Sequence, residues 1–203
     1  MLTPTTNLSI TLTLTLLFSA GIFTLLQSPE LKADTYVIDN EHSSIRFSID
    51  HLGISRTTGR FGNISGVFSF DPSRDIATAK TKVFVKTQSI DTNNDKRDAL
   101  LRGFSFFNVT KHPVAMFKST SLTQHKSNSK TGRVTGELTL AGHTHTEIFD
   151  VEFTGEGRDP WLGYRMGFIA KGSIKRSDYE LDFMAGAIGN DVSLEIFVEG
   201  VKK

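Results

Sequence analysis

The alternation of apolar and polar side chains in residues 163–175 constrains the fold more than any other feature of the sequence. The apolar side chains share one parity of the numbering: Tyr164, Met166, Phe168, Ala170 and Ile174. The polar side chains share the other: Arg165, Lys171, Ser173 and Lys175. Because successive side chains of a β-strand point to opposite faces, this segment predicts a strand with one apolar face and one wet face.

The same alternation recurs along the chain with little competing helical period. The further segments that show it are 44–52, 64–70, 79–86, 113–117, 134–140, 149–154 and 192–198, with a short piece at 36–38. Repeated amphipathic strands of this kind build a closed barrel or a sandwich. The residues around Gly59 are interpreted as a glycine-rich link between two of the eight predicted strands.

Residues 92–103 break the alternation and predict one short helix. Capping residues and charges precede three apolar residues, Ala99 to Leu101, and Gly103 is a natural helix end. The phenylalanines that follow are expected to form an apolar plug: Phe104, Phe106 and Phe107. A second irregular stretch, residues 177–190, carries Leu181, Phe183 and Met184. Both segments are expected to cover one mouth of a barrel.

Composition excludes several classes of function. Of 203 residues, 23 are Lys or Arg and 22 are Asp or Glu, and the net charge of +1 with no dense basic run disfavours nucleic acid as a partner. Cysteine is absent, which excludes disulfides, thiolate nucleophiles and cysteine-based metal sites. Phenylalanine is abundant at 16 residues, and its purely apolar ring suits a dry interior or the wall of an apolar ligand site.

The N-terminal segment predicts a secretory signal peptide. Residues 8–26 carry no charge, and the stretch ends near a plausible small-residue cleavage site at residues 31–33. Residues 1–33 are therefore expected to be removed, leaving a mature domain over residues 34–203. An uncleaved anchor is the alternative, because the apolar run is near the length of a membrane span and no Lys or Arg precedes it.

Three polar groupings are candidates for chemistry. His143 and His145 would share one face of a strand, as metal ligands can, but Gly142 indicates the rim of a hairpin, so no metal site is predicted. Asp39, His42 and Ser43 have the residue types of a catalytic triad without a nucleophile elbow or oxyanion hole, so turn chemistry is the preferred interpretation.

The third grouping lies on the predicted helix. Arg97 and Asp98, with Arg102 one turn on, form either a surface ion pair or a polar collar for a ligand head group at the mouth of a barrel. Both interpretations stay open. The residues with inward parity equally leave two alternatives, because an eight-stranded barrel can be packed solid or can hold one small ligand.

An ordered set of short motifs resembles the YceI-like family over essentially all of residues 34–203. The motifs are Tyr36-Val-Ile-Asp39, Phe47-Ser-Ile-Asp-His-Leu-Gly53, Gly66-Val-Phe-Ser-Phe-Asp71, Ser89-Ile-Asp-Thr-Asn93, Arg97-Asp98, Gly136-Glu-Leu-Thr-Leu140, Asp159-Pro-Trp161, Gly167-Phe168 and Val198-Glu-Gly-Val201. The resemblance implies a mainly β fold, an eight-stranded antiparallel lipocalin-like β-barrel with one short helix. It also implies secretion to the periplasm and a hollow barrel that binds a long polyisoprenoid, either a quinone or an isoprenoid precursor.

On this basis the protein is expected to be a lipid binder and not an enzyme, with no cofactor, no bound metal, and a lipid as its partner. Transient contact with a membrane and a homodimer are left open. The residues expected to contact the lipid are Phe47, Ile49, Phe68, Phe70, Val83, Val85, Arg97, Asp98, Leu101, Arg102, Phe106, Phe117, Leu138, Leu140, Met166, Phe168 and Ile196.

The helix departs from the family pattern at two positions, since Leu100 replaces a common His and Gly103 a common Ser. A head-group contact made by that His is therefore not expected here. Two rival functions are a packed barrel without cargo that acts in stress tolerance or protein interaction, and a lipid-modifying enzyme that uses Asp39, His42 or His51.

Overall fold

The structure is a computed structural model that describes residues 33–71 and 78–203. The predicted leader therefore lies, except for Ala33, outside the described residues. The strands are β1 (Thr35–Ile38), β2 (Ser44–His51), β3 (Ser55–Phe61), β4 (Ile64–Ser69), β5 (Lys80–Lys86), β6 (Ile90–Asp91), β7 (Val114–His125), β8 (Asn128–Leu140), β9 (His143–Arg158), β10 (Tyr164–Lys175) and β11 (Ile188–Lys202). The helical elements are α1 (Asp95–Arg102) and the 3-10 turns η2 (Thr87–Ser89) and η3 (Arg176–Tyr179). In this part of the chain, no helix combines the length and the apolar character needed to cross a membrane.

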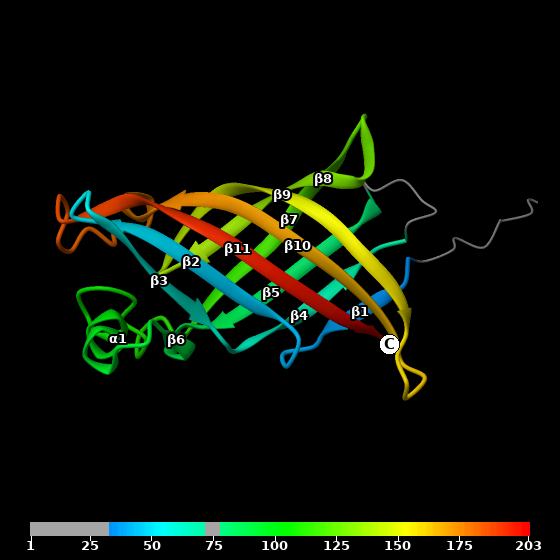
Figure 1. The fold of residues 1–203 in the computed structure, drawn as a ribbon, viewed down its shortest axis with the longest axis horizontal. Helices are drawn as coiled ribbons and strands as arrows, with labels where there is room; N and C mark the ends of the chain where they lie inside the picture. Colours follow the sequence, from blue (N-terminus) through cyan, green and yellow to red (C-terminus); the bar gives the residue numbers. More distant parts are fainter. Residues whose placement is uncertain (1–32, 72–77) are drawn as a thin grey trace, which may run out of the picture. The chain divides into compact units, whose positions relative to one another are not determined.

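Eight strands form a closed antiparallel ring in the order β1-β4-β5-β7-β8-β9-β10-β11, as Figure 1 shows. The ring closes where β11 pairs with β1, with Val201 opposite Val37. On its other edge β1 pairs with β4, where Phe68 lies opposite Tyr36. The predicted fold class, an eight-stranded antiparallel barrel with one short helix, is confirmed.

Three further strands extend the sheet beyond the ring. Residues 188–197 of β11 pair with β2, β2 pairs with β3, and β3 pairs with β6. Strands β1 and β2 thus lie one after the other along β11, separated by the turn at residues 39–43. The interpretation of Gly59 as part of a link was wrong, because Gly59 lies inside β3. The polar sequence of this strand hides it, and a Cβ at Gly59 would come within 2.4 Å of the Phe47 ring, so glycine lets that ring cover the strand.

The helix forms where its capping residues predict it. The Asn94 side chain accepts the Arg97 N–H at 3.0 Å, and the Gly103 N–H donates to the Leu100 carbonyl at 3.0 Å. The apolar plug is only partly confirmed. Phe106 is buried and Phe107 packs against the core, but Phe104 is 88% exposed and so does not plug the barrel.

The segment between η3 and β11 covers the same end of the barrel as α1, as predicted. The Leu52 N–H, in the β2–β3 turn, donates to the Ala187 carbonyl at 2.8 Å, and the Phe106 and Phe183 rings meet edge to face at 5.3 Å. In Figure 1 these segments lie together at the end opposite the β9–β10 turn. The barrel therefore has one end built from a helix and irregular loops.

Side chains of the predicted inward parity form two apolar clusters inside the barrel. One surrounds Tyr36, Ile64 and Met166, each at most 2% exposed. The other contains Phe149 and Tyr179, with many partly buried side chains packed against it. The cavities that the side chains of these clusters enclose are the candidate site.

Candidate functional site

The barrel encloses two adjoining apolar cavities. The larger, about 320 Å³, lies at the α1 end, and the smaller, about 190 Å³, lies between β4, β5, β7 and β10. Five side chains line both cavities and so form a waist between them: Ile45, Val85, Ala115, Leu138 and Leu194. The interior is thus one hollow of two lobes that follow one another along the barrel.

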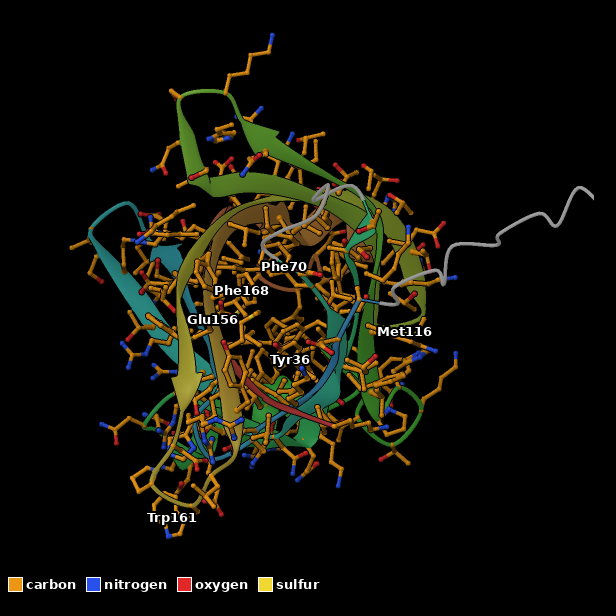
Figure 2. The ribbon with its side chains drawn as sticks, turned by 90° about the vertical axis from the view of Figure 1, so that its right-hand side faces the viewer. Tyr36, Phe70, Met116, Glu156, Trp161 and Phe168 are labelled. Atoms are coloured by element: carbon orange, nitrogen blue, oxygen red, sulfur yellow. The ribbon has the colours of Figure 1, made fainter. Side chains whose placement is uncertain are left out.

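Inward-facing apolar side chains confirm that this space is hollow. Phe117, Leu138 and Ile196 line the two cavities, yet each is only partly buried. A packed core would leave such side chains without accessible surface. In Figure 2, Phe70 and Phe168 point into the barrel, where their rings meet edge to face at 5.3 Å on the wall of the smaller lobe.

Polar groups on the wall of the larger lobe gather near α1 and the end of β2. The polar residues on this wall are Asp50, His51, Thr57, Thr92, Arg97, Arg176 and Tyr179. The Arg97 side chain is oriented by Thr92, donating from Nε to the Thr92 hydroxyl at 2.8 Å and from Nη2 to its carbonyl at 2.7 Å. The head group of a bound molecule would meet hydrogen-bond donors and acceptors here, whereas its tail would meet hydrocarbon.

The structure places most of the predicted ligand-contacting residues on the wall of one lobe or the other. These residues are Phe47, Ile49, Phe68, Phe70, Val83, Val85, Arg97, Leu101, Phe106, Phe117, Leu138, Leu140, Phe168 and Ile196.

Three predicted residues do not line either cavity. Met166 is 1% exposed within the packed cluster around Tyr36. Asp98 is buried, and its Oδ1 accepts the backbone N–H of Thr92 at 3.0 Å and its hydroxyl at 2.5 Å, so it orients Thr92. Arg102 donates to the carbonyl oxygens of Gln88 and Ile90 and so fastens α1 to the strand region. The predicted collar is therefore reduced to Arg97.

Arg176 and Tyr179 are wall residues that the sequence reasoning missed. Arg176 is buried, and its guanidinium donates to the carbonyl oxygens of Leu181, Gly189 and Ile188, which ties the covering loop to η3. Burial lowers the pKa of Arg176. The Tyr179 hydroxyl donates to Glu147 at 2.7 Å, and burial raises its pKa. The available signal was the place of Arg176, directly before the irregular stretch at residues 177–190.

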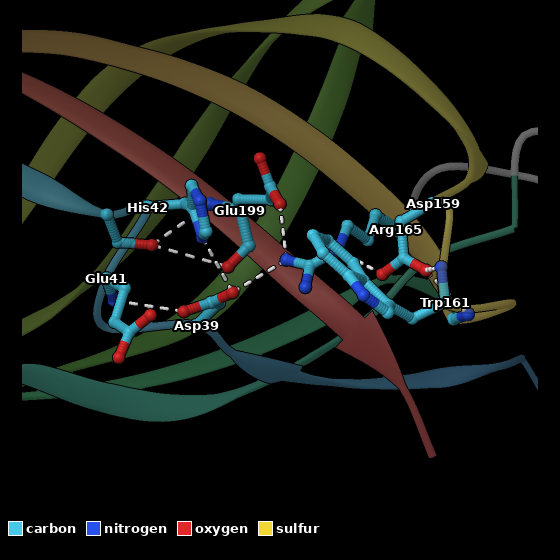
Figure 3. Close-up of polar contacts among 9 residues, drawn as sticks. Asp39, Glu41, His42, Asp159, Trp161, Arg165 and Glu199 are labelled. Atoms are coloured by element: carbon cyan, nitrogen blue, oxygen red, sulfur yellow. Dashed lines mark hydrogen bonds and ion pairs between the residues drawn. The ribbon is translucent and has the colours of Figure 1, made fainter.

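The most connected polar group of the described residues lies on the outer face and is centred on Arg165, as Figure 3 shows. Its Nη1 donates to Asp39 and to Glu199 at 2.6 Å each, and its Nε donates to Asp159 at 2.6 Å. Hydrogen bonds from Arg165 hold the pKa of Asp39 at about 2 and also lower the pKa of Asp159. Arg165 thus joins β10, β11, the 39–43 turn and the β9–β10 turn.

The triad-like residues belong to this structural group. The His42 Nδ1 lies 2.9 Å from Asp39, which raises the pKa of the imidazole, and the Ser43 hydroxyl bonds with the backbone of Glu199 rather than with His42. Asp39, His42 and Glu199 lie close enough to hold a metal ion. Arg165 already supplies a cation to both carboxylates, so we assign no metal to them.

The two histidines of the β8–β9 hairpin also stay apart from the cavity. His143 opens β9 directly after the turn, 3.6 Å from a Glu180 carboxylate oxygen, and the His145 ring packs edge to face on Tyr179. The prediction of a hairpin rim is confirmed.

Comparison with known proteins agrees with this architecture. The model of the YceI-like domain matches residues 36–200. The chain belongs to the YceI-like family. A UPF0312 protein of Vibrio campbellii is 41% identical over 190 residues, covering 92% of this chain and 98% of the relative. A UPF0312 protein of Azotobacter vinelandii is 40% identical over 181 residues, covering 88% and 93% of the two chains.

Solved structures of YceI proteins share the barrel. The Campylobacter jejuni YCEI protein is 31% identical, with a TM-score of 0.64 over 76% of this chain and 90% of that one. A polyisoprenoid binding domain from Saccharophagus degradans, implicated in plant cell wall breakdown, has a TM-score of 0.61 at 17% identity, covering 85% of this chain and all of that domain. The likeness to the Saccharophagus domain shows the fold alone.

Proposed function

We propose that the protein binds a long polyisoprenoid, either a quinone or an isoprenoid precursor, inside the barrel. We further propose that it does so in the periplasm, after its leader has been cleaved. The observation that carries this proposal is the pair of apolar lobes joined at a waist of five aliphatic side chains. A flexible hydrocarbon chain can follow such a path, whereas a compact ligand would need only one lobe.

The energetics favour a chain that fills both lobes. Moving apolar surface out of water contributes about 25 cal/mol for each Å², so a few hundred Å² of tail supplies several kcal/mol before the costs of ordering the ligand. Arg97 and Thr92, near the mouth, would meet the polar head. The Saccharophagus domain, which has the same fold and is described as polyisoprenoid-binding, adds support.

Mass spectrometry of organic extracts tests the proposal directly. Protein isolated from the periplasmic fraction of its native host is expected to release a stoichiometric isoprenoid or quinone. If no lipid co-purifies and none can be loaded from detergent, the packed barrel without cargo becomes the better account. A lipid that the wild-type protein modifies, but a His51→Ala variant leaves intact, would identify an enzyme instead.

A matched pair of variants tests the path of the tail. Ala115→Phe places a ring in the waist between the lobes, whereas Val114→Phe places the same ring on the outer face, where Val114 is exposed. We expect Ala115→Phe to exclude long polyprenols while still binding a short one, and Val114→Phe to bind both. Equal uptake of long polyprenols by the two variants would contradict a tail that spans both lobes.

A further inference from the structure

The end of the barrel that carries α1 presents an apolar rim around the larger lobe. The rim is formed by the exposed large apolar side chains of the β2–β3 turn, of α1 with its following turn, and of the loop before β11: Leu52, Ile54, Leu100, Phe104, Phe183 and Met184. They are half of the exposed large apolar side chains of residues 33–71 and 78–203. Clustering of this kind marks an interaction surface rather than scattered surface residues.

Two of these side chains project almost entirely into solvent. Ile54 is 83% exposed at the tip of the β2–β3 turn, and Phe104 is 88% exposed just after α1. Their segments are nevertheless held firmly, since α1 is capped at both ends and Leu52 is hydrogen-bonded to Ala187. The backbone segments that carry the apolar tips are therefore anchored by hydrogen bonds.

The apolar rim continues into the cavity without a polar boundary at two points. Leu100 and Met184 belong both to the exposed rim and to the wall of the larger lobe. A hydrocarbon chain that moved from a bilayer against the rim into the barrel would keep contact with apolar side chains throughout. Through bulk water, the same chain would expose all of its surface, at a cost of about 25 cal/mol for each Å².

The charges near the rim indicate how it would bind. Residues 50–56, 95–107 and 176–188 contain five Lys or Arg residues and six Asp or Glu residues, so the end as a whole has little net charge. Attraction to anionic head groups is therefore not the main contribution. The rim would therefore bind by inserting its apolar tips between the lipid head groups, and this binding should depend only weakly on salt concentration.

From these observations we infer that the apolar rim docks on the surface of a lipid bilayer, from which the barrel takes its cargo through the α1 end. This inference rests on the proposed function, and it adds the partner surface and the route of entry. The exposed pair Trp161 and Leu162 lies in the β9–β10 turn, at the opposite end of the barrel in Figure 1. Neither residue lines the larger or the smaller lobe, so the pair provides a matched control.

The test measures the pick-up of a radiolabelled polyprenol from phosphatidylcholine vesicles by full-length protein, in parallel with loading from detergent. The rim variant carries Ile54→Asp and Phe104→Asp, and the control carries Trp161→Asp and Leu162→Asp. We expect the rim variant to pick up lipid at least about tenfold more slowly, the control to stay within about twofold of wild type, and both to load normally from detergent. Because every variant shares residues 1–33, that segment contributes equally to all of them.

Each other outcome is decisive. Normal detergent loading with equal pick-up by the rim and control variants would overturn the docking role but leave lipid binding intact. Failure of the wild-type protein to load even from detergent would refute both proposals. If the rim substitutions converted a dimer to a monomer in light scattering and left pick-up unchanged, the rim would be the contact with a second copy of the chain.

Discussion

Two regions of the barrel interior are built from the same alternating strands but differ in how they are filled. Around Tyr36 and Met166 the side chains pack closely, and the Tyr36 ring stacks at 5.1 Å on Phe68, its partner on the neighbouring strand β4. Around Leu138 and Leu194, inward-facing side chains leave the two lobes between them. Alternation therefore determines which side chains face inward, whereas the closeness of their packing determines whether they fill the space between them.

Truncating one inward-facing side chain in each region should give the largest difference between the two regions, measured as the loss in free energy of unfolding. Met166→Ala removes a side chain that is 1% exposed and leaves a new void, so we expect a loss of about 2–5 kcal/mol in the free energy of unfolding. Leu138→Ala enlarges a cavity that already exists and should cost only about 1 kcal/mol. Urea unfolding of ligand-free protein measures both values. Similar losses would mean that the hollow region is filled in solution.

Loading with lipid should stabilise the protein through the hollow region. A polyprenol at about a hundred times its dissociation constant is expected to add about 2.7 kcal/mol to the stability of the folded state. The Ala115→Phe variant should gain little from the same long polyprenol, because the ring occupies the waist. Thermal unfolding with and without lipid measures the gain. An equal gain in both proteins would place the ligand outside the two lobes.

Acid should weaken the ionic group on the outer face before it affects the cavity. The folded-state pKa of Asp39, about 2, lies below its ordinary value of 3.8, so the contribution of this carboxylate is present above pH 3.8 and is lost as pH falls towards 2. We expect Arg165→Met to lower the melting temperature at pH 6 and to reduce the loss of stability between about pH 4 and pH 2. Thermal unfolding across this range provides the measurement. Parallel pH profiles for the two proteins would show that Arg165 does not hold the Asp39 carboxylate.

The smallest effect is expected at His42, which is exposed beside Asp39. Because its folded-state pKa is raised above 6.5, its contribution to stability is present below pH 6.5 and is lost as pH rises through the folded-state value. An NMR titration of the imidazole measures this pKa directly. The Asp39→Asn variant should bring it back towards 6.5, whereas a control substitution at His143, away from this group, should leave it unchanged.

Much of the fold follows from local patterns in the sequence. The period of two identified seven of the eight ring strands, but it counted β2, which lies outside the ring, and gave β1 only as a short extra piece. Capping residues predicted a helix within residues 92–103, and α1 forms there between Asn94 and Gly103. The polar strand β3 was missed because its partners, not its own side chains, place it in the sheet. Phe104 was expected to belong to the apolar plug because it is one of three phenylalanines that follow the helix. The sequence does not show in which direction a side chain points after a helix ends.

The candidate site could be predicted in its composition but not in its shape. Most of the expected wall residues do line the cavities, yet parity could not distinguish Met166 in the packed region from Phe168 on the wall. Arg165 and Asp39 are separated by 126 positions, and no local signal links two charges so far apart. Arg176 likewise contacts carbonyl oxygens of a loop whose conformation the sequence does not specify.

The pairing of β1 with β11 sets the order of events during synthesis. β1 leaves the ribosome early, whereas its partner residues 200–202 are among the last of β11 to emerge. Strands β4 to β10 can pair with their neighbours as they appear, but the ring stays open until β11 arrives. Such long-range closure is intrinsically slow. Until then the apolar inner face remains uncovered, so the incomplete chain is exposed to association with other unfolded chains.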